Sequence, residues 1–230
     1  MIRKRIPQEG LKLIACLSML IDHAAAIFNW GLRWRAIGRL AFPIYCFLLV
    51  EGVYHTRDSK KYALRLAISA VISEIAFDFA FYGRCVWQSQ NVMLTLLLGV
   101  LALETMKRCP SLLLKILAVI PFAVVADAFN TDYRWYGVLM VALFGLAREF
   151  PGKWLLLTAG MALLAARMIG ATVMILGISV PLQMFTLLSL LPISLYSGEK
   201  LTRNKAAQWG FYLFYPVHMV LLRLLWLVLR

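Results

Sequence analysis

Long apolar stretches separated by short polar connections run along the whole chain, and each approaches the length of a membrane helix. A helix that crosses the hydrocarbon core needs about 20 predominantly apolar residues. The pattern predicts an all-α polytopic membrane protein of about nine spans, within a range of about eight to ten. The predicted spans are Leu11–Asn29, Ala36–His55, Tyr62–Tyr82, Asn91–Lys107, Leu112–Ala128, Asp132–Arg148, Trp154–Met168, Ala171–Tyr196 and Gln208–Leu229.

The eighth stretch, Ala171–Tyr196, is long and contains Pro181 and Pro192, which remove backbone donors. A kink, a re-entrant turn or two short passes are all compatible with such a segment. Two full spans would move Lys200 and the basic residues after it to the outer side. We therefore predict one broken helix.

Composition agrees with the membrane class, since hydrophobic residues make up 62% of the chain and the mean hydropathy is +0.79. The basic head Met1–Gly10 leads into a stretch that carries Asp22 and His23 and lacks a small-residue cleavage site. This favours a retained first span over a signal peptide. No internal repeat, low-complexity tract or linker divides the chain, so residues 1–230 are expected to form one domain.

The net charge of +13 comes from arginines and lysines that cluster between the apolar stretches. Cytoplasmic connections of membrane proteins carry such an excess, and the distribution predicts a cytoplasmic N-terminus. Nucleic-acid binding is not needed to explain the charge. Trp30, Trp34 and Trp135 are predicted to lie at the membrane interface.

Two histidines lie deep inside otherwise apolar segments: His23 in the first span and His218, two positions after Pro216, in the last. An ionisable side chain in hydrocarbon costs roughly 2.5–3.5 kcal/mol on insertion scales, so it indicates function by default. With a rise of about 1.5 Å per residue, His23 lies roughly 16 Å above Lys12, and His218 roughly 15 Å above Gln208. The two histidines are therefore predicted at similar depth.

Other polar residues form pairs at helical spacing, as Glu51 with His55 and Glu74 with Asp78. Asp22 and His23 are adjacent and point about 100° apart along a helix. Asp22 is therefore expected to meet a cation on another helix, such as Arg39 or Arg65. For each carboxylate and arginine of this set, an ion pair that only locks helices together is an equally good interpretation.

The four cysteines are scattered, with Cys85 and Cys109 in connections predicted on opposite sides of the bilayer. No disulfide framework or zinc spacing follows, and nothing in the sequence demands a metal.

The sequence resembles the TraX family, conjugation-associated membrane proteins linked to N-terminal acetylation of pilin. Several separated stretches carry the resemblance in order along the chain. They are Leu11–His23, Ile37–Thr56, Lys61–Asp78, Asn91–Gly99, the Asp132-Tyr133 pair with Gly137, and Phe211–His218.

This family is similar in turn to a wider membrane acyltransferase superfamily, in which a basic residue, ten intervening positions and a histidine recur in an early helix. Lys12 and His23 meet that spacing. One departure lies after Tyr133, where Arg134 stands and a glycine is expected soon after the tyrosine. Carried over by resemblance, the functional positions are Asp22, His23, Arg39, Glu51, Arg65, Glu74, Asp78, Asn91 and His218.

The resemblance implies acyl transfer from cytoplasmic acetyl-CoA or another acyl-CoA, in a bacterial cytoplasmic membrane, to a peptide or glycan acceptor. The acceptor is expected to be the N-terminal amine of a pilin-like or other peptide, and a hydroxyl of an envelope glycan or peptide is the alternative. His23 is expected to act as general base, and Arg39 or Asn91 to steady the oxyanion. Lys12, Lys61 and Arg65 are expected to contact the phosphates of the donor, and Asn91 is also expected among the donor-binding residues.

These roles predict a water-accessible cavity open to both sides and lined by His23, Arg39, Glu74, Asp78 and His218. A proton-coupled small-molecule transporter is the competing class, in which these carboxylates and His23 would form a proton relay. The chain shows no repeated topology of the kind that transporters often have. A membrane scaffold would need none of the buried polar residues.

Overall fold

The structure is a computed structural model that describes residues 5–168, 170–201 and 205–230. The chain divides into two compact units. Unit 1 comprises Met1–Leu48 and Thr158–Arg230, and unit 2 comprises Leu49–Leu157. The expectation of one domain over residues 1–230 stays a prediction.

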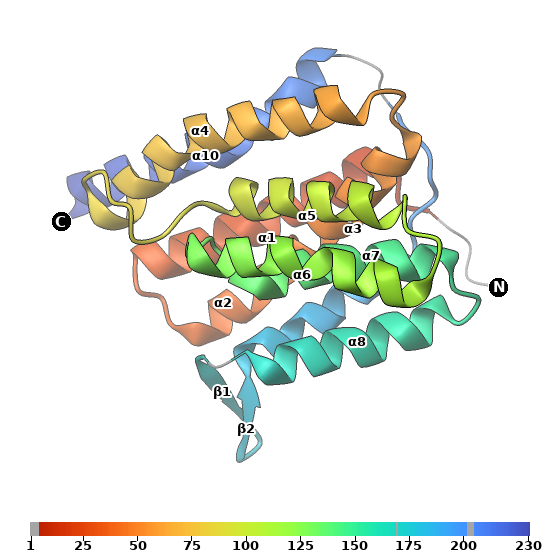
Figure 1. Ribbon diagram of the computed structural model, residues 1–230. Coiled ribbons are helices and arrows are strands. Elements are labelled where there is room, and N and C mark those ends of the chain that lie inside the picture. The colour runs from red at the N-terminus through yellow and green to blue at the C-terminus, as the bar shows by residue number, and fades with distance from the viewer. Residues whose placement is uncertain (1–4, 169, 202–204) are drawn as a thin grey trace. The chain divides into compact units, whose positions relative to one another are not determined.

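Unit 1 is built around the first helix, α1, which packs against both α2 and the last helix, α10 (Figure 1). It also contains the first half of α3, the second half of α8, a two-stranded hairpin, a 3-10 helix and the short helix α9. The bounds of these elements are α1 Gln8–Ile27, α2 Leu32–Gly38, α3 Ala41–His55, α8 Lys153–Arg167, β1 Thr172–Ile175, β2 Ile178–Pro181, η1 Leu182–Ser189, α9 Leu190–Ser194 and α10 Lys205–Leu229.

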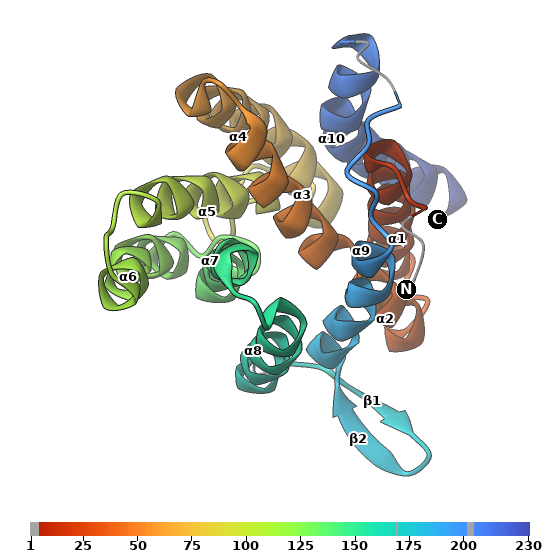
Figure 2. The same cartoon turned by 90° about the vertical axis from the view of Figure 1, so that its right-hand side faces the viewer.

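Unit 2 is a helical bundle in which α5 contacts α4, α6 and α7. Figure 2 looks along this bundle and shows α5, α6 and α7 side by side. Alanine and valine side chains fill the contact between α5, α6 and α7, together with Leu98 and Met106. The bounds are α4 Ser59–Tyr82, α5 Val92–Met106, α6 Leu112–Ala128 and α7 Arg134–Glu149.

Polar side chains immediately before three helices of unit 2, α4, α5 and α6, fix where those helices begin. Asp58, Asn91 and Ser111 accept hydrogen bonds from backbone N–H groups in the first turns of α4, α5 and α6. Such caps satisfy donors that have no partner within the helix. The hydrogen bond from the backbone N–H of Lys61 lowers the pKa of the Asp58 carboxyl.

Three helical segments are long and apolar enough to cross a membrane: Gln8–Ile27, Leu32–His55 and Trp209–Leu229. Most of the other predicted spans are shorter, since α5 and α8 have 15 residues, α7 has 16 and α6 has 17. The 24-residue α4 is long enough but carries more charge. The membrane character of the chain follows from the three apolar segments, and the count of nine spans stays a prediction.

The prediction of one broken helix over Ala171–Tyr196 was wrong. Residues 172–181 form an antiparallel hairpin, in which Thr172 pairs with Pro181 and Ile175 with Ile178. The β-branched residues of the two strands favour extended backbone. Leu176 and Gly177 both have positive φ, which is the backbone form of a tight hairpin turn. Leucine is not a typical residue for this turn, so the sequence did not indicate a hairpin here.

The predicted span Ala36–His55 is also interrupted. Within the apolar segment Leu32–His55, Arg39 and Leu40 form a turn between α2 and α3, and the side chain of Arg39 is buried there. The interruption contains no proline, and the sequence therefore predicted a continuous helix.

The connection into α7 has two successive residues with positive φ, Tyr133 and Arg134. Non-glycine residues rarely adopt this conformation. A glycine expected by resemblance at this point would meet the same backbone requirement without strain. In this chain Arg134 occupies the position and forms an ion pair of 2.9 Å with Asp127.

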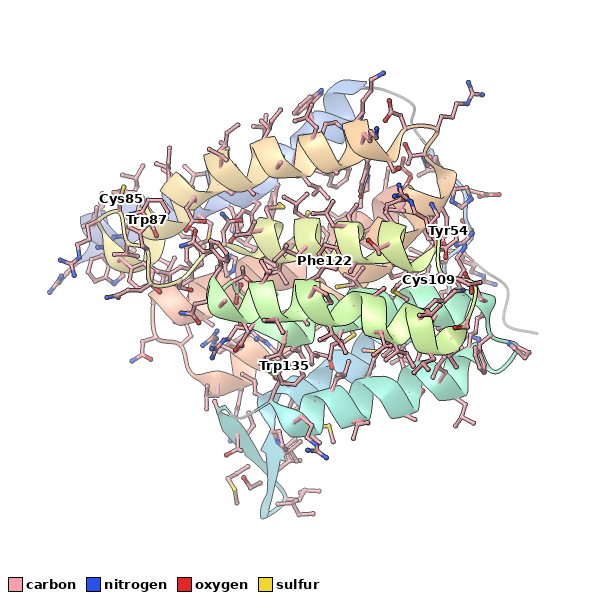
Figure 3. The ribbon with its side chains drawn as sticks, viewed as in Figure 1. Tyr54, Cys85, Trp87, Cys109, Phe122 and Trp135 are labelled. Atoms are coloured by element: carbon pink, nitrogen blue, oxygen red, sulfur yellow. The ribbon has the colours of Figure 1, made fainter. Side chains whose placement is uncertain are left out.

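The two ends of unit 2 differ in chemistry. Figure 3 shows Cys85 and Trp87 on the connection between α4 and α5, at the opposite end of the bundle from Tyr54 and Cys109. Cys85 and Cys109 thus lie at opposite ends of unit 2, and their placement on opposite sides of a bilayer stays a prediction. Trp135 is partly buried against the core cluster of α5, α6 and α7, whereas Trp30 and Trp34 are exposed, and their placement at a membrane interface stays a prediction.

Gly99 allows α5 and α7 to approach closely, and its replacement tests this packing. A Cβ atom at Gly99 would lie 2.7 Å from Cγ2 and 3.0 Å from Cβ of Val141, a stiff branched side chain. Gly99→Ala should lower the free energy of unfolding by about 1–3 kcal/mol, as overpacking does. Thermal unfolding of the purified protein in detergent measures the change.

Gly145→Ala is the matched control, because its Cβ would meet only the end of the flexible Leu103 side chain. Alanine also has the higher helix propensity. Gly145→Ala should therefore leave the melting temperature unchanged or raise it. If Gly99→Ala melted at or above the temperature of Gly145→Ala, the proposed contact between α5 and Val141 would be wrong.

Candidate functional site

The two histidines predicted at similar depth meet in unit 1. Nδ1 of His23 on α1 lies 2.7 Å from Nε2 of His218 on α10, within hydrogen-bond distance. Their rings are nearly parallel, with an interplanar angle of 5° and centroids 5.0 Å apart. Tyr215 packs its ring edge-on against both histidines. Sequence positions 23 and 218 therefore form one site, which we call the histidine pair.

A second contact shows how α1 and α10 are aligned. Nearer the start of both helices, the ammonium of Lys12 lies 4.9 Å from the ring centroid of Phe211. Lys12 precedes His23 on α1, and Phe211 precedes His218 on α10. The two helices therefore run in the same direction, as the first and ninth spans of the predicted topology would.

The hydrogen bonds of the pair assign its tautomers. Nδ1 of His218 lies 2.6 Å from the backbone oxygen of Phe214, and a carbonyl oxygen can only accept. Nδ1 of His218 therefore carries a hydrogen, and in the neutral ring Nε2 is the acceptor. Nδ1 of His23 must then donate to it, which places the lone pair of a neutral His23 on Nε2.

Asp22, the neighbour of His23, turns toward α2. It accepts a hydrogen bond from Nη2 of Arg39, whose side chain is only 7% exposed, and from Nε of Arg35 at 3.1 Å. The predicted pairing of Asp22 with Arg39 is present. Arg35 was not predicted, although it precedes Arg39 by four residues and so shares its helix face.

Gly38 makes this contact possible. A Cβ atom at Gly38 would lie 2.1 Å from Cβ of Asp22, so any larger residue would displace α1 from α2. The backbone of α2 therefore packs directly on the Asp22 side chain. Asp22 is held on one side of α1 while His23 faces α10.

A separate polar group lies in unit 2, where Glu74 and Asp78 share one face of α4. Oε2 of Glu74 accepts from the backbone N–H of Asn91 at 3.0 Å and from the Asn91 amide. Oδ2 of Asp78 accepts from the backbone N–H of Val86 at 2.9 Å. Both carboxylates thus bind the connection between α4 and α5. Their other oxygens, Oε1 and Oδ1, are buried without a hydrogen-bond partner in the part of the chain that the structure describes.

Asn91 is occupied by structural contacts. Its amide donates to the backbone oxygen of Ala70 at 2.8 Å, and its Oδ1 accepts from the backbone N–H of Met93 as the cap of α5. The geometry thus gives Asn91 the role of joining α4 to α5. Its expected roles at the oxyanion or the acyl donor stay predictions.

The cations expected to contact the donor phosphates do not all share one environment. Lys12 packs on Phe211 in unit 1, whereas Lys61 and Arg65 lie near the start of α4 in unit 2. Lys61 forms an exposed ion pair with Asp58 at 3.3 Å, and Arg65 stacks over Tyr62. Their binding of a donor and the cavity predicted around the site both stay predictions.

Glu51 belongs to an ion-pair network of unit 2 that sequence reasoning missed. It pairs with Arg148 on α7, and Tyr54 donates to Glu149 at 3.2 Å. Glu149 also pairs with Lys115 on α6. These contacts join α3, α6 and α7 at one end of the unit, which favours the structural interpretation of Glu51.

Removing Asp22 tests the buried ion pair. Asp22→Ala leaves the nearly buried Arg39 charge without its carboxylate partner, a change that costs roughly 3–5 kcal/mol at buried pairs. The melting temperature in detergent should fall clearly. Asp127→Ala is the control, because its pair with Arg134 is 44% and 51% exposed and is expected to contribute about 0–1 kcal/mol. Equal losses for the two variants would show that the Asp22 pair does not stabilise the fold.

Comparison with known proteins extends over nearly the whole chain. The family profile described as "TraX protein" matches residues 7–226. A curated relative from Dichelobacter nodosus, "Probable fimbrial assembly protein FimC, serogroup H1", is 36% identical in an alignment that covers 92% of each chain. No solved structure matches the chain. The family match includes both helices of the histidine pair, and the chain belongs to the TraX family.

Proposed function

We propose that the protein is a membrane-embedded acetyltransferase that moves the acyl group of a cytoplasmic acyl-CoA to the N-terminal amine of a pilin-like peptide. The observation that carries the proposal is the hydrogen bond between His23 and His218 from opposite ends of the chain. Buried imidazoles in membrane helices are costly and indicate function. The link of the TraX family to pilin acetylation and the fimbrial assembly relative support the acceptor class.

In the proposed reaction, Nε2 of His23 is the general base. The acceptor nitrogen attacks the thioester carbonyl, a nitrogen–carbon bond forms, and His23 Nε2 takes the proton from that nitrogen. The carbon–sulfur bond then breaks, His23 returns the proton to the leaving sulfur, and coenzyme A leaves as the thiol. His218 is a positioning residue, because its hydrogen bond to His23 Nδ1 keeps the lone pair of His23 on Nε2.

Arg39 is the proposed donor to the oxyanion that forms during attack. Asp22 and the backbone oxygen of Arg35 accept from its guanidinium, so the group is held in place before the reaction. Preorganised donors of this kind stabilise developing charge without a cost of reorganisation. Lys12, which is at the start of α1, is the proposed contact for the anionic donor in unit 1.

The proposal places the protein in the bacterial cytoplasmic membrane with its N-terminus inside. Basic residues are concentrated in alternate connections, as the positive-inside bias requires. The common direction of α1 and α10 supports an odd number of crossings between them. The opposite positions of Cys85 and Cys109 in Figure 3 agree with connections on two sides of a membrane.

Native cysteines test this orientation. A Cys109→Ser variant keeps the exposed Cys85, and a Cys85→Ser variant keeps Cys109, while Cys16 and Cys46 are buried in both. A membrane-impermeant maleimide added to intact cells should label the first variant and not the second. Both should be labelled after the membrane is permeabilised. Labelling of Cys109 alone in intact cells would reverse the proposed orientation.

Acyl transfer itself is tested with the purified protein in lipid nanodiscs, radiolabelled acetyl-CoA and a peptide with a free N-terminal amine. His23→Ala should lower the rate by about 10²–10⁴-fold, the usual contribution of a general base. The exposed third histidine supplies the control, and His55→Ala should retain the rate. Transport of a substrate without any acyl turnover would instead support the transporter.

Two replacements of His218 separate positioning from simple packing. The glutamine side chain of His218→Gln offers an amide oxygen that can accept from His23 Nδ1, whereas the methyl group of His218→Ala cannot. The Gln variant should therefore retain more activity than the Ala variant at equal folded fraction. Equal rates would refute the positioning role.

The pH profile of His23→Ala distinguishes the acceptors. An α-amino group has a reference pKa of about 7.7–8.0, so raising the pH supplies the neutral amine without a base. The residual rate of His23→Ala should increase with pH if the acceptor is an amine. A hydroxyl acceptor predicts a variant that stays inactive at every pH.

A further inference from the structure

The hairpin of β1 and β2 exposes apolar side chains that the described elements of unit 1 leave uncovered. Leu176 at the turn is 99% exposed, and Ile178 and Met174 are 67% and 61% exposed. Only the base of the hairpin is packed, where Val173 lies in one buried cluster with Ala36 of α2 and Leu182. A free apolar turn of this kind requires a covering environment, because exposed apolar clusters indicate an interaction surface.

The sequence around the hairpin carries no charge. No charged residue occurs between Arg167 and Glu199, and the hairpin lies within this stretch. A docking surface for a peptide commonly has a polar rim with charges that set orientation. The uncharged surface of the hairpin instead suits the apolar side of a lipid layer.

The position of the hairpin in unit 1 sets its level in the membrane. It packs on Ala36, near the beginning of the apolar segment Leu32–His55 that is long enough to span a bilayer. Trp30 and Trp34, which flank the start of that segment, are exposed as interfacial tryptophans are. The base of the hairpin is thus at one boundary of the hydrocarbon, on the side of the connection between α1 and α2.

The hairpin also extends across the direction of the helices. In Figure 1 it leaves the end of α8 at a steep angle to α1 and α8, and Figure 2 shows it directed away from α1. It therefore extends sideways, along a membrane surface, if α1 is a span. Among the residues that the structure describes, the sheet has two strands, so each strand keeps one outer edge without a partner strand. Unpaired backbone groups exclude the hydrocarbon centre and require the wetter headgroup region.

We propose that the Thr172–Pro181 hairpin is a membrane-interface anchor that inserts Leu176, Ile178 and Met174 into the lipid leaflet on the side of the connection between α1 and α2. Its backbone edges stay among the headgroups, and the apolar side chains at its turn reach the acyl chains. The hairpin packs on α2, and Arg35 of α2 together with Arg39, which directly follows α2, binds Asp22, the neighbour of His23. The hairpin is thus linked to the histidine pair through α2, which contacts Asp22 next to His23. The proposal does not depend on acyl transfer.

The test places a fluorescent probe at the turn of the full-length protein in nanodiscs. Leu176→Cys is made together with Cys85→Ser and Cys109→Ser, and the thiol is labelled with an environment-sensitive fluorophore. Lipids that carry a nitroxide near the headgroup or deep in the acyl chain then quench it according to depth. We expect quenching by both lipids, with the shallow nitroxide more effective, and loss of labelling by a charged maleimide in intact membranes.

Two controls use the same chain. Cys109→Ser keeps the exposed Cys85 as a probe on a polar connection, where no lipid quenching and rapid maleimide labelling are expected. Val71→Cys, combined with the two serine replacements, reports an exposed apolar position within α4 and should be quenched most by the deep nitroxide. The two controls give the quenching and labelling expected of a water-exposed and of a lipid-exposed position, with which the hairpin probe is compared.

The anchor is overturned if the probe at position 176 behaves like Cys85, with free labelling and no quenching. It is also overturned if protection at position 176 appears only after a pilin-like peptide is added, since the hairpin would then be a peptide-docking surface. Neither outcome changes the acetyl-transfer assay. Failure of the anchor and failure of the proposed function are therefore distinguishable.

Discussion

The ion pair between Asp22 and Arg39 is the constraint on which the candidate site depends. A charge in a membrane helix must be paired or solvated, and here the partner comes from the turn that separates α2 from α3. The interruption of the second predicted span and the glycine before Arg39 both serve this contact, because a side chain at Gly38 would collide with Asp22. The distortion of the helix is thus explained by the charge that it pairs.

Two adjacent residues on α1 contact different neighbouring helices. Positions 22 and 23 point about 100° apart, so the same turn presents a carboxylate to α2 and an imidazole to α10. The carboxylate is used to fix α2 and is not available to orient His23. The orienting group is instead His218, whose own Nδ1–H is bound to the backbone oxygen of Phe214. In the proposed reaction the base is oriented by a second hydrogen-bonding group, and that group is an imidazole in place of a carboxylate.

Sequence reasoning predicted those parts of the site that depend on helical periodicity and charge. The partner of Asp22 and the equal depth of His23 and His218 both follow from spacing along helices, and the structure confirms them. The pairing of Glu51 with Arg148 was not predicted, because helical spacing does not indicate which distant helix lies beside α3. Asn91 illustrates a different limit, because a residue that caps one helix and bonds another has no periodic signal.

The hairpin was missed for a local reason. A long apolar segment with two prolines resembles an interrupted membrane helix, since hydropathy averages over many residues and does not detect turn geometry. The distinguishing signal was the β-branched content of residues 172–180 around Leu176-Gly177, but the first turn position lacked the usual asparagine or glycine. Where a membrane protein places strands, their backbone groups limit them to protein-covered or headgroup regions.

The spacing of Lys12 and His23 acquires a physical meaning in the proposed reaction. Eleven residues are close to three helical turns, so both side chains lie on nearly the same face of α1, separated by roughly 16 Å. Both contact α10, through Phe211 and His218. That face of α1 therefore packs against α10 within unit 1. A donor held by its phosphates at the start of α1 would have to extend its thioester arm along the contact between α1 and α10. A shift of one or two residues in the spacing would rotate the cation away from this contact by about 100–200° and break the alignment.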